Sequence, residues 1–284
     1  MNEKILTLQE IYREGAQILQ AAGIEEAKLD AWYLLEYVTG VSRALYYGEP
    51  ERKVSEEQAE RYREYIRRRS GHVPLQHITG EQEFMGYSFL VNPDVLIPRQ
   101  DTETLVEEAL KVTASGMKVL DMCTGSGCIL ISLMKLCPGL SGTGCDISEK
   151  ALKTARENAG RLGVEAKWIQ SDLFDKIPSG RFDLILSNPP YIRTDVIQGL
   201  QEEVRLHDPW IALDGKEDGL YFYRRITKDS ADRINRGGTL MFEIGFDQAK
   251  DVSEIMKEAG YTQIQVKKDL AGLDRVVTGR YNKE

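Results

Sequence analysis

Apolar positions in the first seventy residues recur at the spacing of amphipathic helices. Thr7-x-x-Glu10 and Ser55-x-x-Gln58 match the capping-box pattern, in which two side chains satisfy backbone groups at a helix start. We expect a third helix from about residue 25 to residue 40, and we expect the helix that begins after Ser55 to end near Gly71. The N-terminal part of the chain is therefore predicted to be helical.

The last expected helix of this part carries five arginines between Arg61 and Arg69. Cations near a helix C-terminus are favoured by the helix dipole, so the run is explained by a solvated helix face. A docking surface for an anionic partner, such as RNA or an RNA-bound protein, explains it as well.

The pattern changes after Pro74. Residues 82–91 predict a hairpin that turns at Met85-Gly86. Beyond it, apolar strands alternate with helices such as 148–162 and 219–234. The expected strands are Lys118–Met122, Gly142–Asp146, Lys167–Gln170, Asp183–Ser187, Thr239–Ile244, Ile264–Lys267 and Arg275–Gly279.

Alternating strands and helices predict an α/β fold with a doubly wound, mostly parallel seven-stranded sheet and ligands at the strand carboxyl ends. We expect a small helical domain over residues 1–73, a hairpin linker over residues 74–98 and the sheet domain over residues 99–284.

Composition narrows the class of protein. The chain has 284 residues, 42% of them hydrophobic, and a net charge of −8, so affinity for bare nucleic acid is not expected. No apolar run reaches the length of a membrane span, and the start, Met1–Lys4, lacks the apolar region of a secretory signal. A soluble cytoplasmic protein is predicted. The spacing of the four cysteines predicts no metal site and no disulfide.

A glycine-rich turn follows the first strand of the sheet domain. Gly125 and Gly127 let the backbone turn tightly and approach a ligand, although the full dinucleotide fingerprint is absent. Asp146 ends the second strand, where a carboxylate can accept from both hydroxyls of a ribose. Asp172 follows the third strand and can accept from an adenine amino group, while Asp121 can face a cationic ammonium.

Three carboxylates are unfavourable for a pyrophosphate but suit a ligand with a ribose, an adenine and a positive charge. S-adenosylmethionine is such a ligand. Each acid taken alone is also explained as a helix cap or a loop residue.

The most informative stretch is Asn188-Pro189-Pro190-Tyr191, directly after an apolar strand. Both prolines have a fixed φ and lack an N–H, so the turn presents acceptors: the Asn188 side-chain oxygen and two backbone carbonyls. Such a turn suits a substrate amino group, with Tyr191 as a stacking face. A proline-rich strand exit without a function is the alternative.

These motifs resemble the class I S-adenosylmethionine-dependent methyltransferases, and the Asn-Pro-Pro-Tyr turn resembles that of members acting on planar nitrogen. Further segments are similar to the peptide chain release factor glutamine methyltransferases (PrmC/HemK family), which act in translation termination. They are Pro74–Gly80, Glu83-Phe84, Leu96–Glu103 and Asp218–Ile226.

The resemblance implies methyl transfer from S-adenosylmethionine to the glutamine amide of a Gly-Gly-Gln motif in release factors, which are the expected partners. It implies substrate binding by Asn188, Pro189, Pro190 and Tyr191, and a catalytic set of Asn188, Pro189 and Tyr191. Together with the acids above, the expected cofactor contacts are Asp121, Cys123, Thr124, Gly125, Ser126, Gly127, Asp146, Asp172, Leu173 and Asn188.

The chemistry explains these assignments. A glutamine amide nitrogen is a poor nucleophile, and the Asn188 Oδ1 and Pro189 carbonyl can accept its two N–H bonds and stabilise the positive charge that develops on it. Tyr191 either stacks on the amide plane or packs in the core. Arg99 and Glu243 stay outside the catalytic set, since each can line the pocket or form an ion pair.

Other functions remain open. A glutamine methyltransferase acting on a ribosomal protein and an adenine-N6 nucleic-acid methyltransferase share the turn and the cofactor. An NAD-dependent oxidoreductase lacks support because the dinucleotide fingerprint is missing. A non-catalytic adenosine-binding module leaves the Asn-Pro-Pro-Tyr turn unexplained.

Overall fold

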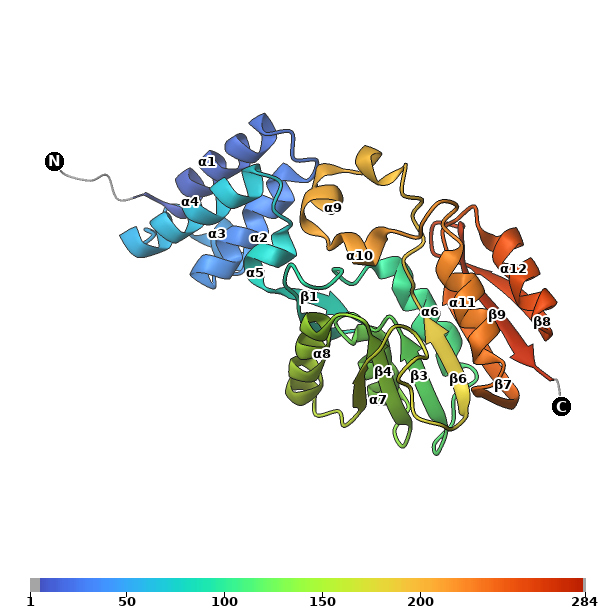
Figure 1. Ribbon diagram of the computed structural model, residues 1–284. Coiled ribbons are helices and arrows are strands. Elements are labelled where there is room, and N and C mark those ends of the chain that lie inside the picture. Colours follow the sequence, from blue (N-terminus) through green and yellow to red (C-terminus); the bar gives the residue numbers. More distant parts are fainter. Residues whose placement is uncertain (1–5, 283–284) are drawn as a thin grey trace. The chain divides into compact units, whose positions relative to one another are not determined.

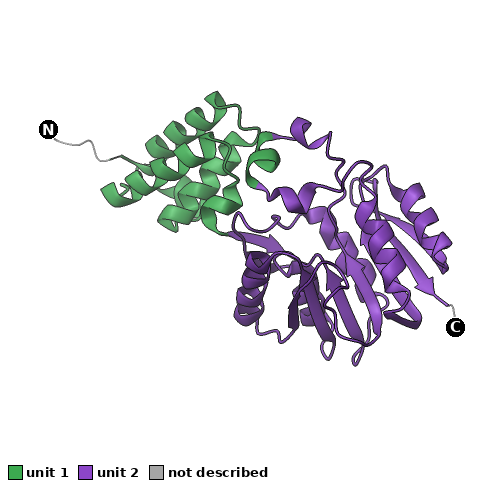
Figure 2. Ribbon diagram, in the orientation of Figure 1, with its two compact units in different colours: residues 1–80, 202–207 green, residues 81–201, 208–284 purple. Residues whose placement is uncertain are grey.

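The computed structural model describes residues 6–282, so the start of the chain, Met1–Lys4, lies outside the described residues. The chain divides into two compact units, shown in Figure 2. The first, called here the helical unit, comprises residues 1–80 and 202–207. The second, called the sheet unit, comprises residues 81–201 and 208–284. The predicted hairpin lies in the sheet unit.

The helical unit is built from short amphipathic helices around one core. Both predicted capping boxes are confirmed, at Thr7 and Ser55. Ile11, Leu35 and Tyr62 are among its fully buried side chains. Its helices are α1 (Leu8–Ala21), α2 (Ala27–Thr39), α3 (Arg43–Gly48), α4 (Glu56–Ser70), α5 (Leu75–Thr79) and α9 (Glu202–His207).

The arginine run on α4 does not form one solvated face. Arg69 is buried and bonded to Asp30 and Glu203. Arg63 pairs with Glu14 at 2.9 Å, and Arg68 donates to the carbonyl of His77. Much of the arginine charge is therefore used inside the helical unit.

The sheet unit contains a seven-stranded sheet among its described residues, in the order β5-β4-β3-β6-β7-β9-β8 (Figure 1). Neighbours from β5 to β7 run parallel, and β9 runs antiparallel to both β7 and β8. This confirms the predicted fold class. The strands are β3 (Lys118–Met122), β4 (Ser141–Asp146), β5 (Lys167–Gln170), β6 (Phe182–Ser187), β7 (Ile234–Glu243), β8 (Tyr261–Lys268) and β9 (Asp274–Tyr281).

Side chains that alternate along the strands enter two separate apolar clusters. Leu120 and Ile185 belong to one cluster, whereas Val119 and Leu184 belong to the other. Because successive strand residues point to opposite faces, the sheet is buried on both sides, as parallel sheets require. The remaining helices are α6 (Gln100–Leu110), α7 (Cys128–Leu136), α8 (Glu149–Leu162), α10 (Trp210–Leu213), α11 (Tyr221–Ser230), α12 (Ala249–Glu258) and the 3₁₀ turn η1 (Ile197–Gly199).

The hairpin of β1 (Glu81–Phe84) and β2 (Tyr87–Leu90) turns at Met85-Gly86, as predicted. The predicted end of one helix is wrong: α11 stops at Ser230, and β7 begins already at Ile234. Ile234 is fully buried and pairs with Phe182 of β6. Pairing between strands therefore starts β7 before the apolar run at residues 239–244 from which it was predicted.

Among residues 6–282, no helix combines the length and the apolarity that crossing a bilayer requires.

Candidate active site

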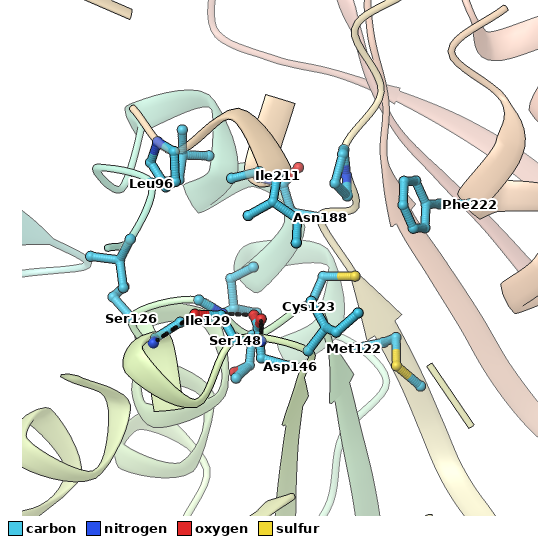
Figure 3. Close-up of a pocket in the computed structure, with 18 of the residues that line it drawn as sticks. Leu96, Met122, Cys123, Ser126, Ile129, Asp146, Ser148, Asn188, Ile211 and Phe222 are labelled. Atoms are coloured by element: carbon cyan, nitrogen blue, oxygen red, sulfur yellow. Dashed lines mark hydrogen bonds between the residues drawn. The ribbon is translucent and has the colours of Figure 1, made fainter. Parts of the chain in front are cut away.

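A cavity of about 300 Å³ lies at the carboxyl ends of the parallel strands. The strand order reverses between β3 and β6, which is where open α/β sheets bind ligands. The turns after β3, β4, β5 and β6 all contribute to it. Figure 3 shows Asp146, the last residue of β4, and Asn188, the first residue after β6, on the walls of this cavity.

The turn after β3 forms one wall through Cys123, Thr124, Gly125 and Ser126. Cys123 has a positive φ of 61°, which is rare for a side chain with a Cβ and often marks a functional site. Gly127 has φ 79°, and a Cβ there would lie 2.9 Å from Ile131 Cδ1. The predicted need for glycine at 127 is therefore steric as well as conformational, although Gly127 itself does not border the cavity.

Asp146 lines the cavity and holds the first turn in place. Its carboxylate accepts from the backbone N–H groups of Gly125 and Ser148, each at 2.9 Å. Burial raises the pKa of Asp146, and these two hydrogen bonds oppose that rise. Two hydrogen bonds therefore fix the carboxylate at the strand end where the sequence predicts a ribose contact.

Asp121 lies behind the wall rather than on it. It is fully buried and accepts a hydrogen bond from the Thr124 hydroxyl, which does border the cavity. Within the described chain, its Oδ1 has no hydrogen-bond partner. Burial, reinforced by the charge of Asp146, raises the pKa of Asp121 to about 7. Its predicted role beside an ammonium stays a prediction.

Asp172 and Leu173 line the cavity after β5. Leu173 adopts a positive φ of 47°, the second such residue on the cavity wall. Asp172 is bound at 3.1 Å by Arg225 of α11, whose guanidinium also stacks over Tyr221. Both residues of α11 border the cavity. Asp172 therefore already has a cation beside it, and its predicted adenine contact stays a prediction.

In the turn after β6, Asn188 and Pro190 border the cavity, whereas Pro189 and Tyr191 do not. The Asn188 Nδ2 lies 3.4 Å from the Thr102 hydroxyl. This contact directs the amide nitrogen toward α6 and leaves Oδ1 as the free acceptor.

Tyr191 is held by its backbone. Gln248 donates to its carbonyl at 3.0 Å, and a Cβ on Gly219, which has φ 74°, would lie 2.5 Å from that carbonyl. The ring packs against the core, and burial raises the pKa of its hydroxyl. Core packing accounts for what is seen of Tyr191, and its stacking on a substrate stays a prediction.

Three wall residues had no role assigned from the sequence: Leu96, Ile211 and Phe222 (Figure 3). Arg99, for which the sequence left pocket lining and ion pairing open, does both. Arg99 is held at 2.7 Å by the buried carboxylate of Asp208. The segments 96–103 and 218–226 carry part of the family resemblance, and no local spacing links them to the strand ends. Their proximity depends on the packing of α6 and α11.

Glu243 at the end of β7 neither borders the cavity nor forms an ion pair within 4 Å among the described residues. Within residues 6–282, no group of three or more His, Cys, Asp or Glu side chains is arranged to hold a metal ion.

Two family models match the chain: the PrmC N-terminal domain over residues 10–80 and the methyltransferase small domain over residues 100–204. A release factor glutamine methyltransferase from Agrobacterium fabrum is 44% identical over 270 residues, covering 92% of this chain and 93% of the relative. A release factor glutamine methyltransferase from Geobacter sulfurreducens is 40% identical and covers 99% of both chains.

Solved structures are similar in fold. A T. thermophilus 16S rRNA N2 G1207 methyltransferase, solved in complex with AdoMet and guanosine, superposes with a TM-score of 0.52 at 16% identity. The match covers 71% of this chain and 50% of that protein.

Proposed function

The chain belongs to the family of release factor glutamine methyltransferases, and from this premise we propose that its cavity binds S-adenosylmethionine beside a release-factor glutamine. The enzyme methylates that glutamine on its side-chain amide nitrogen, which is the N5 position. The observation that carries the proposal is that Asp146 and Asn188, from different strand ends, open on one cavity of about 300 Å³.

The residues present fit the cofactor. Asp146 offers a carboxylate to hydroxyl groups, and the turn at Gly125 brings backbone close to the cavity. Just behind Thr124, Asp121 buries a carboxylate oxygen that has no hydrogen-bond partner within residues 6–282, which suits a ligand that carries a positive charge. We assign cofactor contacts to residues that border the cavity, namely Cys123, Thr124, Gly125, Ser126, Asp146, Asp172, Leu173 and Asn188. Asp121 and Gly127 support this wall from behind.

S-adenosylmethionine held there would supply a methyl group on a sulfonium sulfur, and the electron pair of its S–C bond would remain on the sulfur. The glutamine nitrogen would form the new N–C bond and release one proton to water. The chain's own part is to position that nitrogen. Asn188 Oδ1 and the Pro189 carbonyl accept its two N–H bonds, and Pro190 and Tyr191 fix the turn. Acceptors aimed at developing charge contribute roughly 3 kcal/mol each.

The helical unit is proposed to recognise the body of the release factor. The acids at the strand ends and the Asn188 turn all lie in the sheet unit. When a flexible Gly-Gly-Gln loop enters the cavity, a second surface is needed to orient the release factor that carries it. Contacts away from the reacting amide supply binding energy that positions the substrate. We assign the enzyme to the cytoplasm, with a protein as its partner and no direct contact with nucleic acid.

The test of the function is incubation of the full chain with labelled S-adenosylmethionine and purified release factor, followed by peptide mass mapping. The label is expected on the glutamine of the Gly-Gly-Gln motif and on no other residue. A ribosomal-protein glutamine that is labelled faster than the release factor would overturn the assignment of substrate.

The test of the helical unit compares two substrates. A chain that begins near Val73 should methylate intact release factor about tenfold or more slowly than the full chain, because remote positioning is lost. A short Gly-Gly-Gln peptide should be a weak substrate for both, with a much smaller difference. Because α9 loses its partners in this truncation, the peptide also reports whether the sheet unit is intact. Equal rates on intact release factor would remove the docking role.

A further inference from the structure

Glu243 is a buried acid that the proposed mechanism does not use. It is the last residue of β7 and only 2% exposed. Among the described residues, its Oε2 has no hydrogen-bond partner. An unsatisfied carboxylate oxygen in the interior is costly, so its presence at the end of an apolar strand needs an explanation.

The explanation lies in what surrounds its carboxylate. Ser187 of β6 pairs with Phe242 of β7, so Asn188 and Glu243 lie next to each other at the ends of these two strands. The Thr102 hydroxyl and the Asn188 amide act as donors that lower the pKa of Glu243. The same amide nitrogen lies 3.4 Å from Thr102 Oγ1, so the three side chains form one small network. Glu243 does not reach the cavity, whereas Asn188 and Thr102 both border it. Glu243 can therefore act on a ligand only through these two side chains, of which Asn188 belongs to the proposed catalytic set.

The network fixes the orientation of the Asn188 amide. An ionised carboxylate accepts hydrogen bonds and donates none, so the Asn188 group that faces it must be the NH₂. The Asn188 oxygen is then the atom presented to the cavity. With a neutral partner in place of the carboxylate, the flipped amide becomes an acceptable alternative, and it would present two donors to a substrate amide that needs acceptors.

Glu243 is not neutralised by the nearest cation. Arg275 lowers the pKa of Glu243 through its charge, yet its guanidinium is bound by Asp269 at 3.0 Å and by Asp101 at 3.1 Å. Burial outweighs the hydrogen bonds and this charge, and raises the pKa of Glu243 to about 7. The titratable or charged groups that face it from neighbouring elements are Asp101, Cys128, Tyr191, Tyr223 and Arg275.

We propose that Glu243 is a positioning residue for methyl transfer: its carboxylate holds Asn188 with Oδ1 toward the target amide and offsets the positive charge that develops on the target nitrogen. This inference rests on the proposed function, because it assumes that Asn188 accepts from the glutamine amide. The path of charge runs from the substrate N–H to Asn188 Oδ1, and from Asn188 Nδ2–H to Glu243. Hydrogen bonds in such a chain strengthen one another in a low-dielectric interior.

The kinetic test uses Glu243→Gln in the full chain, with the Gly-Gly-Gln peptide as substrate. We expect kcat to fall roughly tenfold to 10²-fold, less than for loss of a direct contact, with little change in the KM for the peptide. Glu243→Asp keeps the charge at shorter reach and should recover part of the loss. Glu103→Gln is the matched control: it neutralises an acid on the same helix as Thr102, outside the cavity, and should leave kcat unchanged.

The pH profile separates positioning from packing. A protonated Glu243 loses its charge and its preference for the Asn188 NH₂, so the wild-type kcat should fall as pH drops through about 7. The fall in kcat over that range should be clearly smaller in Glu243→Gln, where only Asp121 still titrates beside the cavity, and Glu103→Gln should follow the wild type. A Glu243→Gln variant with the wild-type kcat and the wild-type pH profile overturns the proposal.

A measurement without cofactor or substrate tests the coupling directly. The side-chain amide resonance of Asn188 in an NMR spectrum, assigned by its loss in Asn188→Ala, should shift with pH with a midpoint near 7 in the wild type and stay fixed in Glu243→Gln. The titration of the wild type is informative by itself, because only the assignment and the comparison use variants. If the resonance does not titrate, Glu243 is not coupled to Asn188 and the inference is wrong. If it titrates while the wild type fails to methylate release factor, the coupling stands and the proposed function fails.

Discussion

Asp30 in the helical unit and Glu243 in the sheet unit are both buried carboxylates, yet their surroundings differ. Asp30 accepts from the Arg69 guanidinium at 2.7 Å, inside a network that also contains Glu203. Within the described residues, Glu243 has no ion-pair partner and keeps Oε2 unbonded, and Asp121 likewise keeps Oδ1 unbonded. The helical unit provides Asp30 with a cation and hydrogen bonds. In the described part of the sheet unit, Glu243 and Asp121 each keep one oxygen without a hydrogen-bond partner.

The difference distinguishes a buried carboxylate that stabilises packing from buried carboxylates that are typical of a binding site. A buried ion pair fixes the packing of the elements that carry it, and breaking it is costly. A buried acid with a raised pKa near a cavity is typical of a functional site. Glu243 and Asp121 both have pKa values raised to about 7. Each lies behind a side chain that borders the cavity, Glu243 behind Asn188 and Asp121 behind Thr124. Replacing the acids of the two units should therefore cost stability in one and function in the other.

The largest expected effect is on the stability of the helical unit. Arg69→Ala leaves Asp30 buried without its cation, which should lower the free energy of unfolding by about 3–5 kcal/mol. Urea unfolding at constant pH measures the change. The double variant Asp30→Leu, Arg69→Met removes both charges and should recover much of the loss. A stability of Arg69→Ala equal to the wild type would mean that the pair does not stabilise α2 against α4.

The next effect is on turnover. Asn188→Ala removes the acceptor that faces the target nitrogen and should lower kcat by at least about 10²-fold, with the fold retained by circular dichroism. Asn188→Asp keeps the size and the acceptors but adds a charge beside Glu243, so it should also be impaired. If both variants turn over at nearly the wild-type rate, the turn is a structural strand exit.

A smaller effect is expected on cofactor affinity. Asp146→Ala loses a charge-assisted acceptor at the cavity wall and should weaken S-adenosylmethionine binding by about 1.5–3 kcal/mol, roughly tenfold to 10²-fold. Calorimetric titration measures it. Glu157→Ala, an exposed acid on α8, is the control and should bind as the wild type does. An unchanged dissociation constant for Asp146→Ala would remove this acid from the site.

The last effect is a pH dependence of stability, which compares one protein across pH rather than the loss caused by a substitution. The pKa of Asp121 is raised from 3.8 to about 7 in the folded chain, so folded protein holds this proton more tightly than unfolded chain. Its stabilising contribution is full below about pH 3.8 and is lost as pH rises to about 7. Urea midpoints of the wild type should decline more over this range than those of Asp121→Asn. Parallel declines would show that Asp121 does not carry the difference. Glu243 adds a decline of the same sign to both proteins.

The sequence by itself determined the features that depend on neighbours in the chain. Capping boxes need residues three apart, as at Thr7 and Ser55, and both were predicted. Central strands buried on both faces appear as apolar runs, as at β3 and β6, and the alternation of strands with helices located the other five strands of the sheet. Placing Asp146 and Asn188 at strand carboxyl ends was also possible, because in a parallel sheet these ends meet at one edge.

Only the tertiary structure decided which charges find partners. Arg225 reaches Asp172 across 53 residues of sequence, and Arg69 reaches Asp30 across 39. No periodicity or spacing encodes such a pair, because it depends on how helices pack on distant strands. The same holds for Glu243, which the sequence left between pocket lining and ion pairing. The burial of β7 and the closeness of Thr102 and Asn188 gave it a third role, behind the acceptor rather than beside the substrate.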